Sequence, residues 1–203
     1  MSVLYFIFLA GCSLSITGVP SIHAAETASS EKESEALVRQ AWDAAIVIFE
    51  SSKTHEEKKK KFNDWIVTYF DVTPSARFAL QSRWKKLSPE KRKEYLRLFI
   101  EDMSTTYFTI LANYYQNDKL TILHPKSAKK TSHGHYVLSE IKRQNGQLLS
   151  VKWRVRKKIL DVIVNEASPS YAKREEYKEM IRKNGNTIEG FLEALRKKVL
   201  SQK

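Results

Sequence analysis

The stretch LLSVKWRVR, residues 148–156, alternates apolar and polar side chains. Because successive side chains of an extended strand point to opposite faces, one face of this strand is apolar and the other is basic. The apolar face carries Leu149, Val151, Trp153 and Val155, and the polar face carries Ser150, Lys152, Arg154 and Arg156. A strand with one buried and one solvated face is typical of an antiparallel sheet.

Three neighbouring segments have the same period and are rich in β-branched residues: KLTILHP at 119–125, HYVLSEIKR at 135–143 and ILDVIVNEA at 159–167. The turn sequence QNGQ at 144–147 separates the second segment from the stretch at 148–156. We therefore predict a four-stranded antiparallel meander.

Helical periodicity surrounds these strands on both sides. It predicts helices over 36–49 and 56–69, a helix with Thr73 as N-cap and Pro74 at its first position, and a long helix that begins at Pro89 after the cap residue Ser88. Two further helices are predicted over 170–183 and 187–200. The fold class is therefore α+β, with helices packed on a four-stranded antiparallel sheet.

The second half of the long helix, MSTTYFTILANYY at 103–115, carries no charge and is apolar on nearly every side, which predicts burial on several sides. The sequence contains nine Phe, nine Tyr and four Trp, and they concentrate in residues 62–115. A large filled core explains this excess, and composition favours that interpretation. The alternative is an apolar cavity between the sheet and the long helix.

Residues 1–25 contain no Asp, Glu, Lys or Arg and are interpreted as a signal segment, cut after Ala24 or Ala25. A membrane anchor is one alternative. Lipidation is another, because LAGC at 9–12 has the form of a lipoprotein processing site with Cys12 as the lipidated residue. Residues 26–35 are predicted to be a flexible lead-in, and residues 36–203 a single domain.

The formal net charge is +12, which favours anionic lipid surfaces and acidic proteins as partners of an exported domain. Nucleic acid is not expected as a partner, because Trp153 and the flanking arginines lie on opposite faces of their strand and form no stacking platform. The only cysteine is Cys12, so the mature domain has no thiol chemistry.

No phosphate-binding loop, nucleophile elbow or metalloprotease motif is present. His124, His133 and His135 could converge on a metal, but they lack a carboxylate at matching spacing and are interpreted as ordinary surface histidines. Asp161 is either a buried base or a hydrogen-bonded carboxylate, and the second interpretation is favoured. We predict a protein that is not an enzyme and needs no metal or cofactor.

The blocks of sequence together resemble the MlaC family, the periplasmic phospholipid-binding components of the outer-membrane lipid-asymmetry (toluene-tolerance) ABC transport system, and among them the hopanoid-associated HpnM branch. The resemblance covers residues 37–200 and is carried by FDVTPSARFALQSRWKKLSPEKRKEYLRLF, VKWRVR, DVIVNEAS and REEYKEMIRKNGNTIEGFLEAL. The matched positions are Phe70, Asp71, Ala76, Arg77, Phe78, Ala79, Leu80, Trp84, Pro89, Glu90, Arg92, Arg174, Asn184, Gly185 and Leu195.

Two departures bear on the site. Family members often have Gly where this chain has Gln81, and Glu-Gly-Val-Ser where it has Asn-Glu-Ala-Ser at 165–168. Together with Pro169, these changes predict an altered pocket mouth.

The resemblance implies a monomeric periplasmic carrier with phospholipid as its cargo. Its partners would be an inner-membrane ABC transporter complex of the Mla type and an outer-membrane lipoprotein complex. The predicted lipid-contacting residues are Phe70, Phe78, Trp84, Phe99, Met103, Tyr107, Ile110, Val151, Trp153 and Val162. The alternatives are a hopanoid- or isoprenoid-binding or biosynthesis accessory that uses the same pocket, with Asp161 or a Tyr as acid or base, and an interaction module with a filled core.

Overall fold

The computed structural model describes residues 22–51, 53–117, 121–132 and 134–202, with the backbone alone for residues 22–29, 110, 113, 114, 116, 117 and 121–127. The described elements, in chain order, are α1 (Ile22–Glu50), α2 (His55–Tyr69), α3 (Thr73–Leu80), a 3-10 helix η1 (Gln81–Lys86), α4 (Pro89–Asn117), β1 (Thr121–Thr131), β2 (Gly134–Lys142), β3 (Leu148–Val155), β4 (Ile159–Val164), α5 (Pro169–Lys183) and α6 (Ile188–Ser201). This confirms the predicted α+β class.

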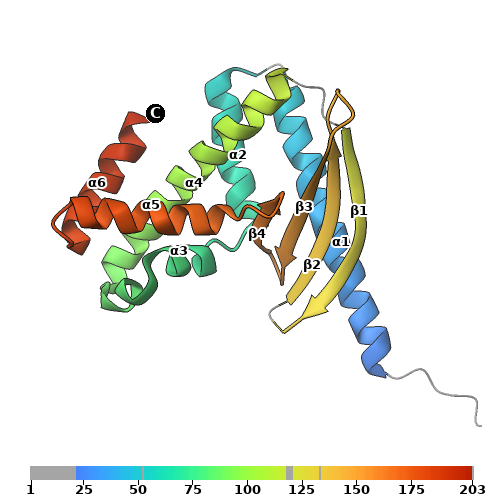
Figure 1. The fold of residues 1–203 in the computed structure, drawn as a ribbon, viewed down its shortest axis with the longest axis horizontal. Helices are drawn as coiled ribbons and strands as arrows, with labels where there is room; N and C mark the ends of the chain where they lie inside the picture. The colour runs from blue at the N-terminus through green and yellow to red at the C-terminus, as the bar shows by residue number, and fades with distance from the viewer. Residues whose placement is uncertain (1–21, 52, 118–120, 133, 203) are drawn as a thin grey trace, which may run out of the picture.

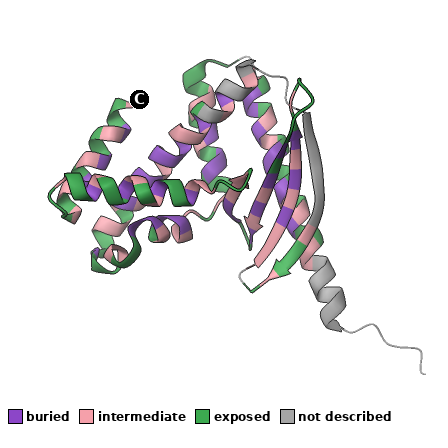
Figure 2. Ribbon diagram, viewed as in Figure 1, coloured by how far each residue is buried: buried purple, intermediate pink, exposed green. Residues whose placement is uncertain are grey.

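The four strands form one antiparallel sheet in the order β1-β2-β3-β4, as the meander prediction requires. Trp153 lies at the centre of the sheet, paired in register with Val137 on β2 and Val162 on β4. Buried residues alternate with more exposed ones along β2 and β3 (Figure 2). The alternation of β3 therefore sets which face of the sheet receives the helices.

The sheet and α1 form one side of the molecule, α3, α5 and α6 form the other, and α2 and α4 lie between them (Figure 1). Helix α1 packs on β1 and β2, α2 packs on α1 and α4, and α3 packs on α5. In the part of the chain described here, no helix has the length and hydropathy needed to cross a bilayer.

Two of the predicted helix starts are instructive. Ser88 Oγ accepts a hydrogen bond from Lys91 N (3.3 Å) before the long helix α4, as expected for a cap residue. The prediction of Thr73 as the N-cap of α3 was wrong. Thr73 is the first helical residue, and its N–H donates to Asp71 Oδ1 (3.1 Å). Val72 occupies the N-cap position and has no side-chain cap, so Asp71 satisfies only the first N–H of the helix.

The N-terminal part of α1 also differs from the prediction, because residues 26–35 lie within this helix rather than in a flexible segment. Its contact with the sheet explains the difference: the hydroxyls of Ser30 and Ser34 lie 3.3 and 3.2 Å from the two ring nitrogens of His135 on β2. Residues 1–21, including Cys12, lie outside the described residues, so the signal segment and its processing stay predictions.

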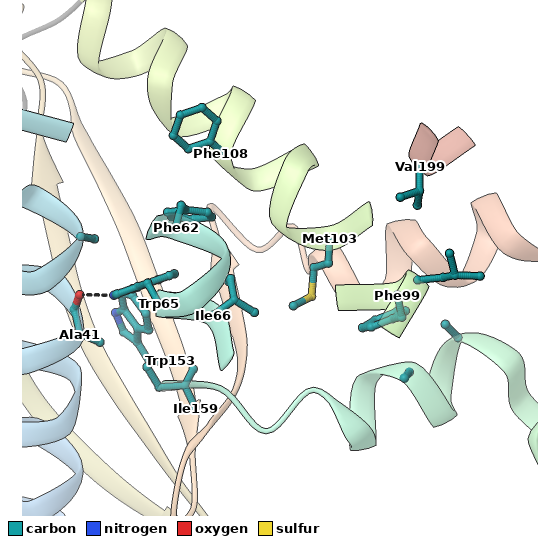
Figure 3. Packing of buried hydrophobic residues seen from close by; sticks show 14 of the residues in the cluster. Ala41, Phe62, Trp65, Ile66, Phe99, Met103, Phe108, Trp153, Ile159 and Val199 are labelled. Atoms are coloured by element: carbon teal, nitrogen blue, oxygen red, sulfur yellow. Dashed lines mark hydrogen bonds between the residues drawn. The ribbon is translucent and has the colours of Figure 1, made fainter. Parts of the chain in front are cut away.

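Aromatic side chains build the core from both sides of the molecule. On the sheet side, Trp42 of α1 packs edge-on against Trp153, with ring centroids 5.1 Å apart, and Trp65 Nε1 donates to the carbonyl of Ala41 (2.8 Å; Figure 3). On the helical side, a second cluster is formed by Tyr95, Phe99, Tyr177 and Phe191. The space between these two clusters holds the site described below.

Candidate functional site: an apolar cavity

A cavity of about 530 Å³ lies between the inner face of the sheet and helices α1, α2, α4 and α5. Ile66 of α2 and Met103 of α4 approach it from different helices, while Trp153 comes from the sheet (Figure 3). Its apolar lining consists of Trp42, Ala45, Phe62, Trp65, Ile66, Phe70, Val72, Met103, Tyr107, Leu111, Ile141, Leu149, Val151, Trp153, Leu160, Val162, Val164, Ala167, Pro169 and Ala172. The volume is within the range of small-molecule pockets, about 300–1,000 Å³.

Several of the residues predicted to contact lipid lie on this cavity: Phe70, Met103, Tyr107, Val151, Trp153 and Val162. The alternation of β3 and the uncharged half of α4 are the signals that located most of them. The side chain of Ile110 lies outside the described residues. Whether any of these side chains contacts a lipid stays a prediction.

The remaining three predicted residues, Phe78, Trp84 and Phe99, do not line the cavity. Phe78 packs against Tyr171 at the interface of α3 and α5, and Trp84 contacts the ring of Tyr95. Phe99 belongs to the helical cluster and packs against Tyr177. Their placement on the cavity was wrong. A sequence pattern can show that an aromatic side chain is buried, but it does not show whether that side chain faces the cavity or fills the core on the helical side of the molecule.

The sequence prediction also missed part of the lining. Phe62, Trp65 and Ile66 are buried on α2, and the helical period of that segment indicates a buried face but not that this face meets a cavity. Trp42 lies on α1, whose placement over the sheet depends on packing between segments far apart in the chain. No local pattern distinguishes a side chain that faces a cavity from one that faces another side chain.

A polar wall interrupts the apolar lining where β4 meets α3 and α5. Asp161 is 8% exposed, and its carboxylate accepts hydrogen bonds from Ser168 Oγ (2.8 Å) and Ser170 Oγ (2.9 Å). Ser170 Oγ also donates to Ser75 Oγ (3.1 Å), which in turn donates to the carbonyl of Leu160 (2.9 Å). Of the two interpretations, Asp161 is therefore a hydrogen-bonded carboxylate on the cavity wall.

The histidine hypothesis gains no support from the described residues. His135 contacts two serine hydroxyls, and His133 and the side chain of His124 lie outside the described part of the chain. Within that part, no three His, Cys, Asp or Glu side chains are grouped as a metal site would require.

The family described as MlaC protein matches residues 39–197, most of the chain. The chain belongs to the MlaC family. The family prediction is thereby confirmed, while placement in the HpnM branch stays a prediction. MlaC is a family of binding and transport proteins, which agrees with the prediction of a non-enzymatic role.

A solved structure supports the MlaC-family fold independently. It is a protein of Ralstonia solanacearum described as a phospholipid-binding protein in complex with a phospholipid, similar to this chain with a TM-score of 0.67 and 20% sequence identity. The similarity covers 83% of this chain and 98% of that chain. At this identity it shows a shared fold. No curated protein matches this chain.

The two departures from the MlaC pattern fall at positions of positive φ. Gln81 has φ 54°, and Asn165 and Glu166 have φ 46° and 64°. Glycine adopts such backbone at little cost, which explains its use in other members of the family. In this chain the turn after β4 keeps its shape through paired backbone hydrogen bonds between Val164 and Ala167. Asn165 and Ala167 line the cavity, so this turn forms part of its rim.

This geometry predicts the effect of restoring glycine at position 81. Gln81→Gly relieves backbone strain of the order of 1–3 kcal/mol. It also removes a surface hydrogen bond that the amide oxygen of Gln81 can accept from Arg174 Nε (2.6 Å). We expect the free energy of unfolding, measured by urea titration, to rise by about 1 kcal/mol.

Gln81→Ala is the matched control, because it loses the same bond and keeps the strain, and it should be less stable than the wild type. A Gln81→Gly variant less stable than the wild type would contradict the strain argument.

A buried ionic network supports the cavity from the side of α4, α5 and α6. Lys173 Nζ donates to Asp102 Oδ2 (2.6 Å), Glu176 Oε2 (3.0 Å) and Thr106 Oγ1 (3.2 Å). Tyr177 OH donates to Asp102 Oδ2 (2.8 Å), and Lys198 Nζ lies 2.6 Å from Asp102 Oδ1. Three helices are therefore joined through one carboxylate.

The electrostatics of this network follow from burial and charge. The side chain of Asp102 is fully buried, and burial alone would raise its pKa. The charges and hydrogen bonds of Lys173 and Lys198 outweigh burial and hold the pKa of Asp102 below its ordinary value. Burial, followed by the charge of Asp102, raises the pKa of Tyr177 far above its ordinary value. Asp102 is thus ionised, and Lys173 and Lys198 compensate its buried negative charge.

Proposed function

We propose that this MlaC-family chain is a lipid carrier that buries phospholipid acyl chains in the cavity between its sheet and its helices. The observation that carries the proposal is the largely apolar lining of a cavity of about 530 Å³. It is supported by the family and by the fold shared with a protein described as phospholipid-binding. The ordinary alternative, a core with no space for a ligand, does not account for that cavity.

The size of the hydrophobic effect explains why such a cargo requires a protein. Two acyl chains contain about 30 methylenes, each worth about 0.8 kcal/mol, so a free phospholipid in water costs about 20 kcal/mol or more. A cavity that substitutes for the bilayer interior removes most of this cost. Release into water would be extremely slow, so the carrier must dock on its donor and acceptor and transfer the lipid directly.

The setting of this transfer is part of the proposal. An exported chain would work in the periplasm, between an inner-membrane ABC transporter complex of the Mla type and an outer-membrane lipoprotein complex. The protein itself binds and releases without an energy source, so these complexes set the direction of transport. The net charge of +12 favours acidic docking surfaces on the partners.

The test is the lipid content of the protein purified from cells without detergent. We expect solvent extraction and mass spectrometry to give about one phospholipid per protein molecule. A hopanoid or another isoprenoid at this stoichiometry would instead support the accessory role and placement in the HpnM branch. A folded protein that contains no lipid, and takes none from phospholipid vesicles, would contradict the carrier proposal.

A further inference from the structure

The half-buried indole of Trp84 on η1 contacts Tyr95 on its core side and two arginines at the surface. Arg77 Cζ of α3 and Arg92 Cζ of α4 lie 6.0 and 5.4 Å from the centroid of the Trp84 ring. Cations this close to an indole are attracted by the negative face of the ring. These contacts hold one aromatic ring and two positive charges together where α3, η1 and α4 meet.

Phe78, the residue after Arg77, continues this arrangement towards α5. Its ring packs edge-on against Tyr171, with ring centroids 4.9 Å apart, and Arg174 Cζ lies 5.1 Å from the centroid of Phe78. Tyr171 is 60% exposed, so its ring offers apolar surface to a partner. We call the following six residues the aromatic–basic strip: Arg77, Phe78, Trp84, Arg92, Tyr171 and Arg174.

The chain around the strip carries charge of one sign. No Asp or Glu occurs from Val72 to Pro89. Within the part of the chain that the structure describes, five cations of this region form no ion pair: Arg77, Arg83, Lys85, Lys86 and Arg92. The neighbouring Lys91 does pair, with Glu189. The five unpaired cations therefore form a positive surface that attracts anionic partners.

The strip lies beside the cavity described above. Ser75, three residues before Phe78 on α3, and Ala172, next to Tyr171 on α5, both line that cavity. Helices α3 and α5 pack against each other (Figure 1). Pro169, the first residue of α5, also lines the cavity and directly follows the turn that forms part of its rim. A surface that binds the strip is therefore held close to the cavity rim.

We infer that the aromatic–basic strip docks on the surface of an anionic lipid bilayer and brings the cavity rim to it. Lysine and arginine are attracted to the negative head-group layer, and the rings of Tyr and Trp suit the boundary between head groups and acyl chains. Protein–protein interfaces also favour Tyr, Trp and Arg but are depleted in lysine, so the exposed Lys85 and Lys86 favour a bilayer. This inference rests on the proposed function and gives the carrier its contact with a membrane.

The first experiment measures cosedimentation of the wild-type protein, purified from cells, with two kinds of vesicle. One kind contains phosphatidylcholine alone, and the other contains phosphatidylcholine and phosphatidylglycerol in equal amounts. We expect binding to the mixed vesicles to be at least about tenfold stronger at low salt. High salt should abolish this difference, because the charges involved are exposed and become screened.

A pair of lysine substitutions tests the charge of this region. Lys85→Gln combined with Lys86→Gln should weaken binding to the mixed vesicles about twenty-fivefold, because each lysine near an anionic bilayer contributes about fivefold. Lys60→Gln combined with Lys61→Gln is the matched control, since it removes the same charge from two consecutive exposed lysines of α2. This control should change binding by less than about twofold, because its lysines lie outside the docking surface.

A further substitution tests the exposed aromatic ring. Tyr171→Ser should weaken binding to the mixed vesicles about fivefold, because the ring loses the apolar surface that it buries in the bilayer. Leu200→Ser on α6 is the control, since Leu200 is also 60% exposed and lies outside the strip. It should leave binding unchanged.

The outcomes separate this inference from the proposed function. Equal weakening by the two lysine pairs would show that binding follows net charge alone, and it would overturn the docking surface. A wild type that does not bind the mixed vesicles would also overturn it and would leave the strip to an acidic protein surface. Neither result affects the carrier proposal as long as the purified protein contains phospholipid. A protein that binds vesicles through the strip but neither contains nor takes up lipid would contradict the carrier and leave the docking surface in place.

Discussion

Replacing Lys173 by methionine is expected to lower the free energy of unfolding by about 3 kcal/mol at pH 7. Lys173 is 4% exposed, and its ammonium contacts both Asp102 and Glu176. Without it the fully buried carboxylate of Asp102 keeps only Lys198 and the Tyr177 hydroxyl. Removing one partner of a buried ion pair costs about 3–5 kcal/mol, and the remaining lysine places this variant at the lower end. Urea-induced unfolding followed by circular dichroism measures the effect.

The matched control is Lys178→Met, on the same helix. Lys178 is exposed and, among the described residues, pairs only with Glu175, at 3.4 Å, so its loss should change stability by less than about 0.5 kcal/mol. Adding Asp102→Asn to Lys173→Met should recover part of the loss, because the uncompensated charge is then gone. A cost below about 1 kcal/mol for Lys173→Met would mean that Lys198 alone neutralises Asp102.

Met103→Trp is expected to reduce the lipid bound per protein molecule at least tenfold. Met103 is a buried residue of α4 whose side chain faces the cavity (Figure 3). The larger indole would occupy space that the proposed acyl chains need, and each excluded methylene loses about 0.8 kcal/mol of binding free energy. Because the indole enters a cavity rather than a filled core, stability should fall by no more than about 1–3 kcal/mol. Loading from phospholipid vesicles, followed by mass spectrometry, gives the measurement.

Val47→Trp provides the control for this second prediction. Val47 lies on α1, is 68% exposed and does not line the cavity, so the added indole should leave loading unchanged. If Met103→Trp folds and still loads a full complement of lipid, the cargo does not occupy the part of the cavity between α2 and α4.

The fold was accessible from sequence because its determinants are local. The alternation of residues 148–156 identified a half-buried strand, and the Ser88-Pro89 pair located the start of the long helix α4. The N-cap of α3 was predicted at Thr73 and lies one residue earlier, at Val72, since helix boundaries read from sequence shift easily by one residue. The extent of α1 was not predictable, because the part of the helix around Ser30 and Ser34 contacts His135, more than a hundred positions away.

The site was only partly accessible from the sequence, because its cavity depends on packing between segments that lie far apart in the chain. The sequence by itself determined that Val151, Trp153 and Met103 point inward, because periodicity fixes the face on which a side chain lies. Only the tertiary structure decided that these side chains meet a cavity while Phe99 and Trp84 fill the core behind it. It also decided that Lys173 is neutralised by Asp102 and Glu176. Burial of one face is a property of a single segment, whereas the space and charge left between segments depend on how all of them pack.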